Sequence, residues 1–140
     1  TKDFDILDPE LSQAVISAAK DFASHVRMEG GELEDDWFNN GPIQLVEVLP
    51  DGWRLRLQDV FVGRRLTLKT LGRPDFLKTK LFALCDRGID LADCIALSPT
   101  ASELSSATPW LSAQDANPLW PDHVRNTLRD LAERLNHGIH

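Results

Sequence analysis

The sequence lacks the features that mark several specialised protein classes. Its two cysteines, Cys85 and Cys94, form no C-x-x-C pair, which excludes a disulfide framework and a zinc knuckle and predicts two small buried apolar side chains. No apolar run approaches the roughly 18 residues that span a bilayer, and no charged start followed by an apolar core marks a signal peptide. We therefore expect a soluble, cytoplasmic protein without membrane association.

Signatures of common enzyme sites are missing as well. No glycine-rich phosphate loop and no G-x-S-x-G turn occur in the sequence, so P-loop and hydrolase functions are set aside. The four histidines do not have the spacing of zinc ligands.

The 140 residues, 42% hydrophobic and 26% charged, are typical of one globular domain with a buried core. The order of elements is strand, helix, three strands and then helices. This order predicts an α+β fold, with a small mixed sheet of about four strands in residues 1–72 and a helical part in residues 73–140.

Hydrophobic periodicity and turn residues place the elements. Asp8 and Pro9 are expected to open a helix that Gly30-Gly31 stops, and residues 32–42 are expected to form a loop. Period-two alternation predicts a first strand, a hairpin of two strands joined through Pro50-Asp51-Gly52, and a further strand, at residues 2–7, 43–49, 53–58 and 66–69.

The helical part has clear start and stop signals. Pro74-Asp75 begins a helix that Gly88 ends, and Asp90 can cap a short helix through Leu97. Thr100 to Glu103 fits a capping box, and a last helix begins at Pro121. Trp110 and Trp120 are interpreted as anchors for this last helix.

The net charge of −7 is unevenly distributed. Residues 1–40 hold ten acidic side chains against three basic ones, whereas residues 54–87 hold nine basic against three acidic. The acidic total argues against non-specific DNA binding, and the basic middle suits either the phosphates of a small ligand or a solvated mixed surface.

Asp3 and Asp5 are the sharpest candidates for chemistry. Residues two apart on a strand point to the same face, so the two carboxylates could share a hard cation such as Mg²⁺ or Mn²⁺. A pair of such ions stabilises phosphoryl or nucleotidyl transfer. The alternative is a solvated face of an edge strand.

Lys80 is the second candidate, because a lysine ammonium in the most basic part of the chain could meet a phosphate. Its alternative is simple exposure on a helix. Arg87, Asp90 and Asp93 form a supporting cluster around Gly88, in which the acids could pair with Arg87 or Lys80 and fix the corner between two helices.

These residues resemble a known family. Asp3-Phe4-Asp5 resembles the D-h-D strand of the polymerase-beta-like nucleotidyltransferases, and residues 73–93 resemble their downstream pair of helices with its lysine, arginine and aspartates. Residues 97–104 resemble the L-x-P-T-x-x-E-L segment of a poorly characterised bacterial branch, which is allied to abortive-infection toxins and minimal antitoxins.

The resemblance implies a magnesium- or manganese-dependent nucleotidyltransferase that moves a nucleoside monophosphate from an NTP to a protein or RNA acceptor. Asp3 and Asp5 would hold the metal, Lys80 would meet the nucleotide phosphates, and Asp90 and Asp93 would order the site. For a third acid, only Asp59 and Glu47 are candidates.

The sequence departs from the family upstream of the D-h-D strand, where a Gly-Ser segment normally grips the triphosphate and this chain opens at Thr1. We therefore expect a shortened nucleotidyltransferase or, as the alternative, an inactive remnant that binds a partner as an antitoxin does. A strand edge left bare would also favour a homodimer.

Overall fold

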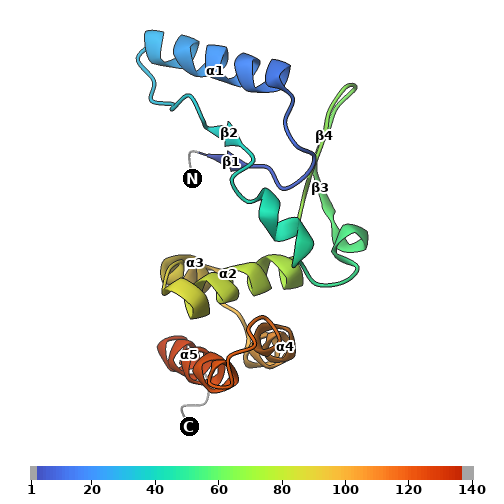
Figure 1. Cartoon of the computed structure of the whole chain (residues 1–140). Helices are drawn as coiled ribbons and strands as arrows, with labels where there is room; N and C mark the ends of the chain where they lie inside the picture. The colour runs from blue at the N-terminus through green and yellow to red at the C-terminus, as the bar shows by residue number, and fades with distance from the viewer. Residues whose placement is uncertain (1–2, 137–140) are drawn as a thin grey trace. The chain divides into compact units, whose positions relative to one another are not determined.

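The computed structural model describes residues 3–136 and divides into two compact units, residues 1–49 and 50–140. Figure 1 shows the helices and strands of each unit. The expectation of α+β structure with a helical C-terminal part is confirmed. The expectation of one sheet of about four strands is wrong, because the described strands form two separate pairs.

The first unit contains a parallel pair of very short strands. β1 (Phe4–Asp5) pairs with β2 (Phe38–Asn39), with Phe4 opposite Phe38. The predicted strand is thus confirmed at its centre, and its first residue, Lys2, lies outside the described residues. The predicted loop at 32–42 is corrected, because it contains β2.

Helix α1 (Gln13–Met28) begins later than the Asp8-Pro9 signal predicted. The side chain of Asn40 accepts a hydrogen bond from the Leu11 amide at 2.6 Å and donates to the Ile6 and Pro9 carbonyls at 2.9 and 3.0 Å. These bonds occupy the backbone before Ser12, so the Ser12 hydroxyl becomes the N-cap by accepting from the Val15 amide. The predicted glycine stop is confirmed, since α1 ends just before Gly30.

The hairpin predicted between residues 43 and 58 is wrong. Its two arms form the 3-10 helices η1 (Ile43–Glu47) and η2 (Trp53–Arg56). Gly52 adopts a positive φ of 79°, and the Arg56 side chain turns back to donate a hydrogen bond to the Asp51 carbonyl at 2.8 Å. A strand at this place would carry Arg56 away from that carbonyl.

A hairpin does form directly after η2. β3 (Gln58–Val62) pairs antiparallel with β4 (Thr67–Thr70), with a bulge between Asp59 and Phe61. The strand predicted at residues 66–69 is therefore confirmed, and it pairs with β3, a strand that was not predicted.

The helices of the second unit enclose its core (Figure 1). They are α2 (Arg73–Arg87), α3 (Leu91–Leu97), α4 (Ala101–Ser112) and α5 (Trp120–Arg134). The starts of all four helices and the ends of α2 and α3 lie within a residue or two of the predicted positions, and no end was predicted for α4. Their buried side chains form one cluster of Leu77, Leu81, Cys85, Cys94, Leu104, Ala107, Leu111, Trp120, Val124, Leu128 and Leu131.

Local signals account for these helix ends. Gly88 ends α2 with a positive φ, and Thr100 and Glu103 form both hydrogen bonds of the predicted capping box. Trp120 anchors the last helix as predicted, because its indole donates to the Leu111 carbonyl at 2.8 Å.

The two cysteines are buried and not bonded to each other, as expected of small apolar side chains. Burial raises the pKa of each thiol to about 11, so neither is a reactive thiolate at neutral pH. Across residues 3–136, the structure contains no helix with the length and apolar character that a membrane span requires.

Candidate functional site

Asp3 and Asp5 are both exposed and flank Phe4 in the first unit. The Asp5 carboxylate accepts a hydrogen bond from the Asn39 amide at 3.2 Å, across the β1–β2 pair. Asp3 borders an open depression of about 370 Å³, whose other lining residues are Arg27, Gly31, Glu32, Leu33 and Glu34.

In the described part of the chain, no third His, Cys, Asp or Glu completes a metal site with these two carboxylates. Among residues 3–136, no three His, Cys, Asp or Glu side chains lie close enough to hold a metal ion together. Of the two proposed third acids, Asp59 lies on β3 of the second unit, 3.9 Å from Lys69, and Glu47 ends η1 of the first. Two carboxylates alone could hold a Mg²⁺ ion that keeps several of its waters.

Lys80 lies on α2 of the second unit, between two carboxylates. Its Nζ is 3.0 Å from Asp93 Oδ2 and 3.5 Å from Asp90 Oδ2, and it also lies over the Phe76 ring. Partial burial alone would lower the pKa of Lys80, but the hydrogen bond to Asp93 and the charges of both acids raise it above its ordinary value. Lys80 therefore stays charged at neutral pH.

Of the two partners predicted for Asp90 and Asp93, the structure shows Lys80, whereas the predicted cap does not form. Asp90 holds the N-cap position of α3 with a positive φ of 66°, but its side chain makes no capping bond and turns to Lys80. Arg87 is exposed in the last turn of α2.

The charge balance of this cluster bears on ligand binding. One lysine and two aspartates sum to a single negative charge, so an anionic phosphate meets no excess positive charge there. The two carboxylates engage two of the three N–H donors of Lys80, so a phosphate would have to compete with them for the charge of the lysine.

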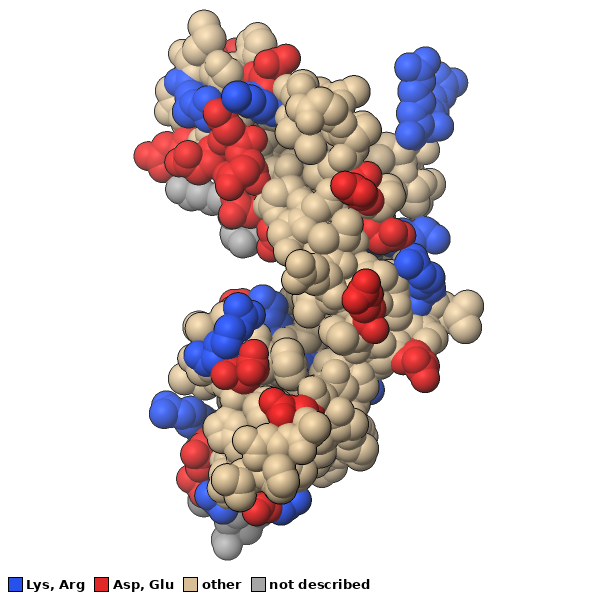
Figure 2. Space-filling model, in the orientation of Figure 1, with Lys and Arg blue, Asp and Glu red and all other residues tan. Residues whose placement is uncertain are grey.

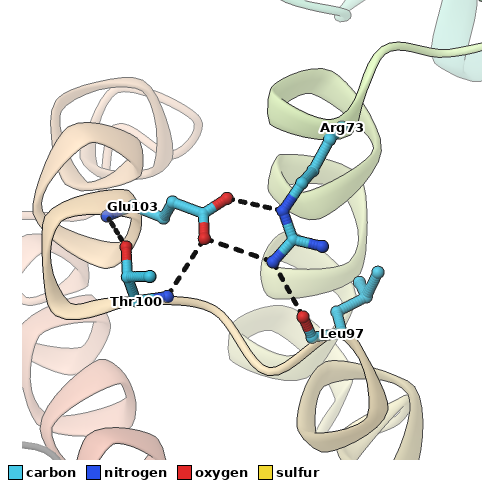
Figure 3. Close-up of polar contacts among 4 residues, drawn as sticks. All are labelled: Arg73, Leu97, Thr100 and Glu103. Atoms are coloured by element: carbon cyan, nitrogen blue, oxygen red, sulfur yellow. Dashed lines mark hydrogen bonds and ion pairs between the residues drawn. The ribbon is translucent and has the colours of Figure 1, made fainter.

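A second ion pair connects α2 with α4 (Figure 3). Arg73 donates through Nε to Glu103 Oε2 at 2.7 Å and through Nη2 to Glu103 Oε1 at 3.2 Å, and Nη2 also donates to the Leu97 carbonyl at 2.7 Å. Glu103 thus closes the capping box with Thr100 and binds Arg73 with the same carboxylate. The Arg73 bonds and the Thr100 amide lower the pKa of Glu103 to about 2.

This lowered pKa predicts a pH dependence of stability. Because the folded pKa lies below the ordinary value of about 4.3, the contribution of Glu103 is present above about pH 4.3 and is lost as the pH falls toward 2. We expect Glu103→Gln to be less stable than the parent at pH 6 and to approach it at pH 2.5. Urea unfolding at both values measures this, and an undiminished gap at pH 2.5 would contradict it.

A third ion pair joins a partly exposed arginine to a fully buried carboxylate. The Asp75 side chain is fully buried at the start of α2, where Arg56 of η2 donates to both carboxylate oxygens at 2.8 and 2.9 Å. These hydrogen bonds raise the pKa of Arg56. The backbone passes so close that a Cβ on Gly72 would lie 2.6 Å from the Arg56 carbonyl oxygen, so only glycine fits there without a shift.

In the part of the chain that the structure describes, the longest run of exposed large apolar residues lies on the β3–β4 hairpin. All five residues of β3 are exposed, among them Val60, Phe61 and Val62 at 66, 52 and 68%, and Leu66, just before β4, is 54% exposed. Figure 2 shows basic side chains at the hairpin tip, where the sequence places Arg64 and Arg65.

Sequence reasoning missed this surface and the ion pairs of Arg73 and Arg56. The run Val60-Phe61-Val62, ended by Gly63 and followed by two arginines, is the signal that could have predicted a hairpin arm. The ion pairs join residues 30 and 19 positions apart and leave no local signal.

Comparisons with known proteins identify no relative: no family model, no curated protein and no solved structure matches this chain.

Proposed function

We propose that this chain is a non-catalytic module that binds a protein partner through the β3–β4 hairpin. The observation that carries the proposal is the exposure of Val60, Phe61, Val62 and Leu66 on one hairpin. Contiguous apolar side chains on a surface are typical of protein interaction sites. The proposal corresponds to the alternative given in the sequence analysis, an inactive remnant of a nucleotidyltransferase that binds a partner.

The hairpin has a physical reason to gain a partner. A two-stranded hairpin is at best marginally stable in water, because it needs a further strand or a packed layer to bury an apolar face. Residues of β3 and β4 are almost all exposed. A partner that covers them would stabilise the hairpin and bury its apolar side chains together.

The charge cluster around Lys80 supports the same proposal. Asp90 and Asp93 neutralise the lysine that a nucleotide site would use. In this arrangement the three residues connect α2 with α3. Their role is therefore structural: they stabilise the packing of these two helices in the second unit, which also contains the hairpin.

Site-specific crosslinking tests the proposal. A photo-reactive residue at Val62, in the whole chain expressed in cells, is expected to give one discrete crosslinked protein band. The same residue at Leu119, which is 72% exposed at the start of α5, should not give that band. Phe61→Asp should remove it. Equal crosslinking at both positions, or none at Val62, would contradict the proposal.

The nucleotidyltransferase interpretation is a second candidate, favoured by the two exposed carboxylates on either side of Phe4. It predicts that ATP with Mg²⁺ or Mn²⁺ raises the melting temperature and that Asp5→Asn removes this effect. Asp36→Asn, an exposed carboxylate outside β1, serves as the control. A parent chain that shows no metal-dependent shift would argue against this candidate.

A further inference from the structure

We infer that the partner presents an extended segment, acidic at one end, which adds as a third strand to the outer edge of β3. The inference rests on the proposed function and specifies the chemistry of the partner. Three observations support it: the hairpin has unpaired strand edges, the two edges carry different side chains, and two arginines at the hairpin tip have no acidic neighbour in the sequence of the loop.

Each strand of the hairpin has one unpaired edge within the described part of the chain, since the sheet contains β3 and β4 alone. Such an edge offers unpaired N–H and C=O groups to an incoming strand. Strand addition is a common way for a sheet to bind an extended peptide, because main-chain hydrogen bonds give affinity and side-chain contacts give specificity.

The two edges differ in their side chains. β4 carries Lys69 between threonine and leucine, and a lysine on an edge strand discourages pairing. β3 carries three consecutive large apolar residues, and its bulge lies before Phe61. The regular part of the open β3 edge is therefore Phe61-Val62, next to the hairpin tip.

The positive charge at the hairpin tip favours acidic residues at the end of the bound segment that lies beside it. Asp59 and Lys69 lie opposite each other at 3.9 Å and balance one another. Arg64 and Arg65 lie in the loop that the Gly63 amide closes on the Leu66 carbonyl at 2.7 Å. Two arginines beside an apolar edge complement carboxylates near one end of an otherwise apolar, β-branched strand.

Nucleic acid would also offer negative charge, but the chain carries a net charge of −7, which repels a long polyanion. On the β3 edge only Phe61 could stack with a base, whereas Val60 and Val62 suit apolar side chains. The observations therefore favour a peptide segment.

A display library of random twelve-residue peptides, selected on the immobilised whole chain, tests the inference. We expect selected peptides to combine alternating β-branched or aromatic residues with Asp or Glu at one end. The double variant Arg64→Glu/Arg65→Glu should weaken binding of a selected synthetic peptide at least about tenfold. A peptide with lysines in place of its acids should regain affinity for that variant.

The double variant Arg125→Glu/Arg129→Glu is the matched control, because both arginines are exposed on α5 and the change in net charge is the same. It should bind the parent peptide as the unaltered chain does. Circular dichroism of each variant checks that the helices are intact.

The outcomes separate this inference from the proposed function. Peptides that require Phe61 but show no acidic preference would overturn the charge argument and leave the hairpin as the binding surface. Peptides that bind regardless of Phe61→Ser would overturn both. A selection without binders, together with self-association that Val62→Lys abolishes, would assign the edge to a second copy of the chain and overturn the inference.

Discussion

Leu81→Ala is expected to destabilise the second unit by about 2–5 kcal/mol, the range for truncating a fully buried leucine. Leu81 has no exposed surface and lies on α2 within the core cluster of the helical unit. The truncation removes apolar burial and leaves a cavity that helices fixed on several sides fill only in part. Urea unfolding followed by circular dichroism at 222 nm measures the loss.

Leu55→Ala provides the comparison, because the Leu55 side chain is 92% exposed. Its effect should stay within about 0.5 kcal/mol. A loss below about 1 kcal/mol for Leu81→Ala would show that the helices pack less tightly than the structure indicates.

Arg56→Ala is expected to have the other large effect. It leaves the fully buried Asp75 carboxylate without its two hydrogen bonds from Arg56, and a buried charge without a partner is strongly destabilising. We expect a lower urea midpoint than for Arg64→Ala, which removes an exposed arginine of the same size at the hairpin tip.

The double variant Arg56→Met/Asp75→Leu tests whether the unpaired carboxylate causes the loss of stability. If the penalty comes from the unpaired carboxylate, replacing both partners by apolar side chains should recover much of the stability that Arg56→Ala loses. A double variant no more stable than Arg56→Ala would contradict this explanation and would point to the bond from Arg56 to the Asp51 carbonyl, which both variants lack.

The sequence predicted the helical unit well because its signals are local. Gly88 and the Thr100–Glu103 capping box act within one turn of the helix that each one ends or begins. The pairing of Lys80 with Asp90 and Asp93 could be predicted for a similar reason, because only the short link around Gly88 separates α2 from α3.

The failures lie where distant residues decide the local conformation. Alternation in Trp53-Arg54-Leu55-Arg56 is typical of a strand, yet Arg56 bonds to Asp75, 19 residues away, and the segment becomes η2. The late start of α1 depends on Asn40, 29 residues from Leu11. Period-two patterns in short segments yield to such tertiary contacts.

The Asn40 bonds also bear on the kinetics of folding. Asn40 must find the Ile6 carbonyl 34 residues away, and closing a chain loop of that length has an entropic cost that helix pairs adjacent in sequence, such as α2 with α3 and α4 with α5, avoid. Chains rich in local contacts fold faster. In a refolding experiment, the helical unit should form early, and the fluorescence of Trp37, whose indole donates to the Ala19 carbonyl, should report the slower closure of the first unit.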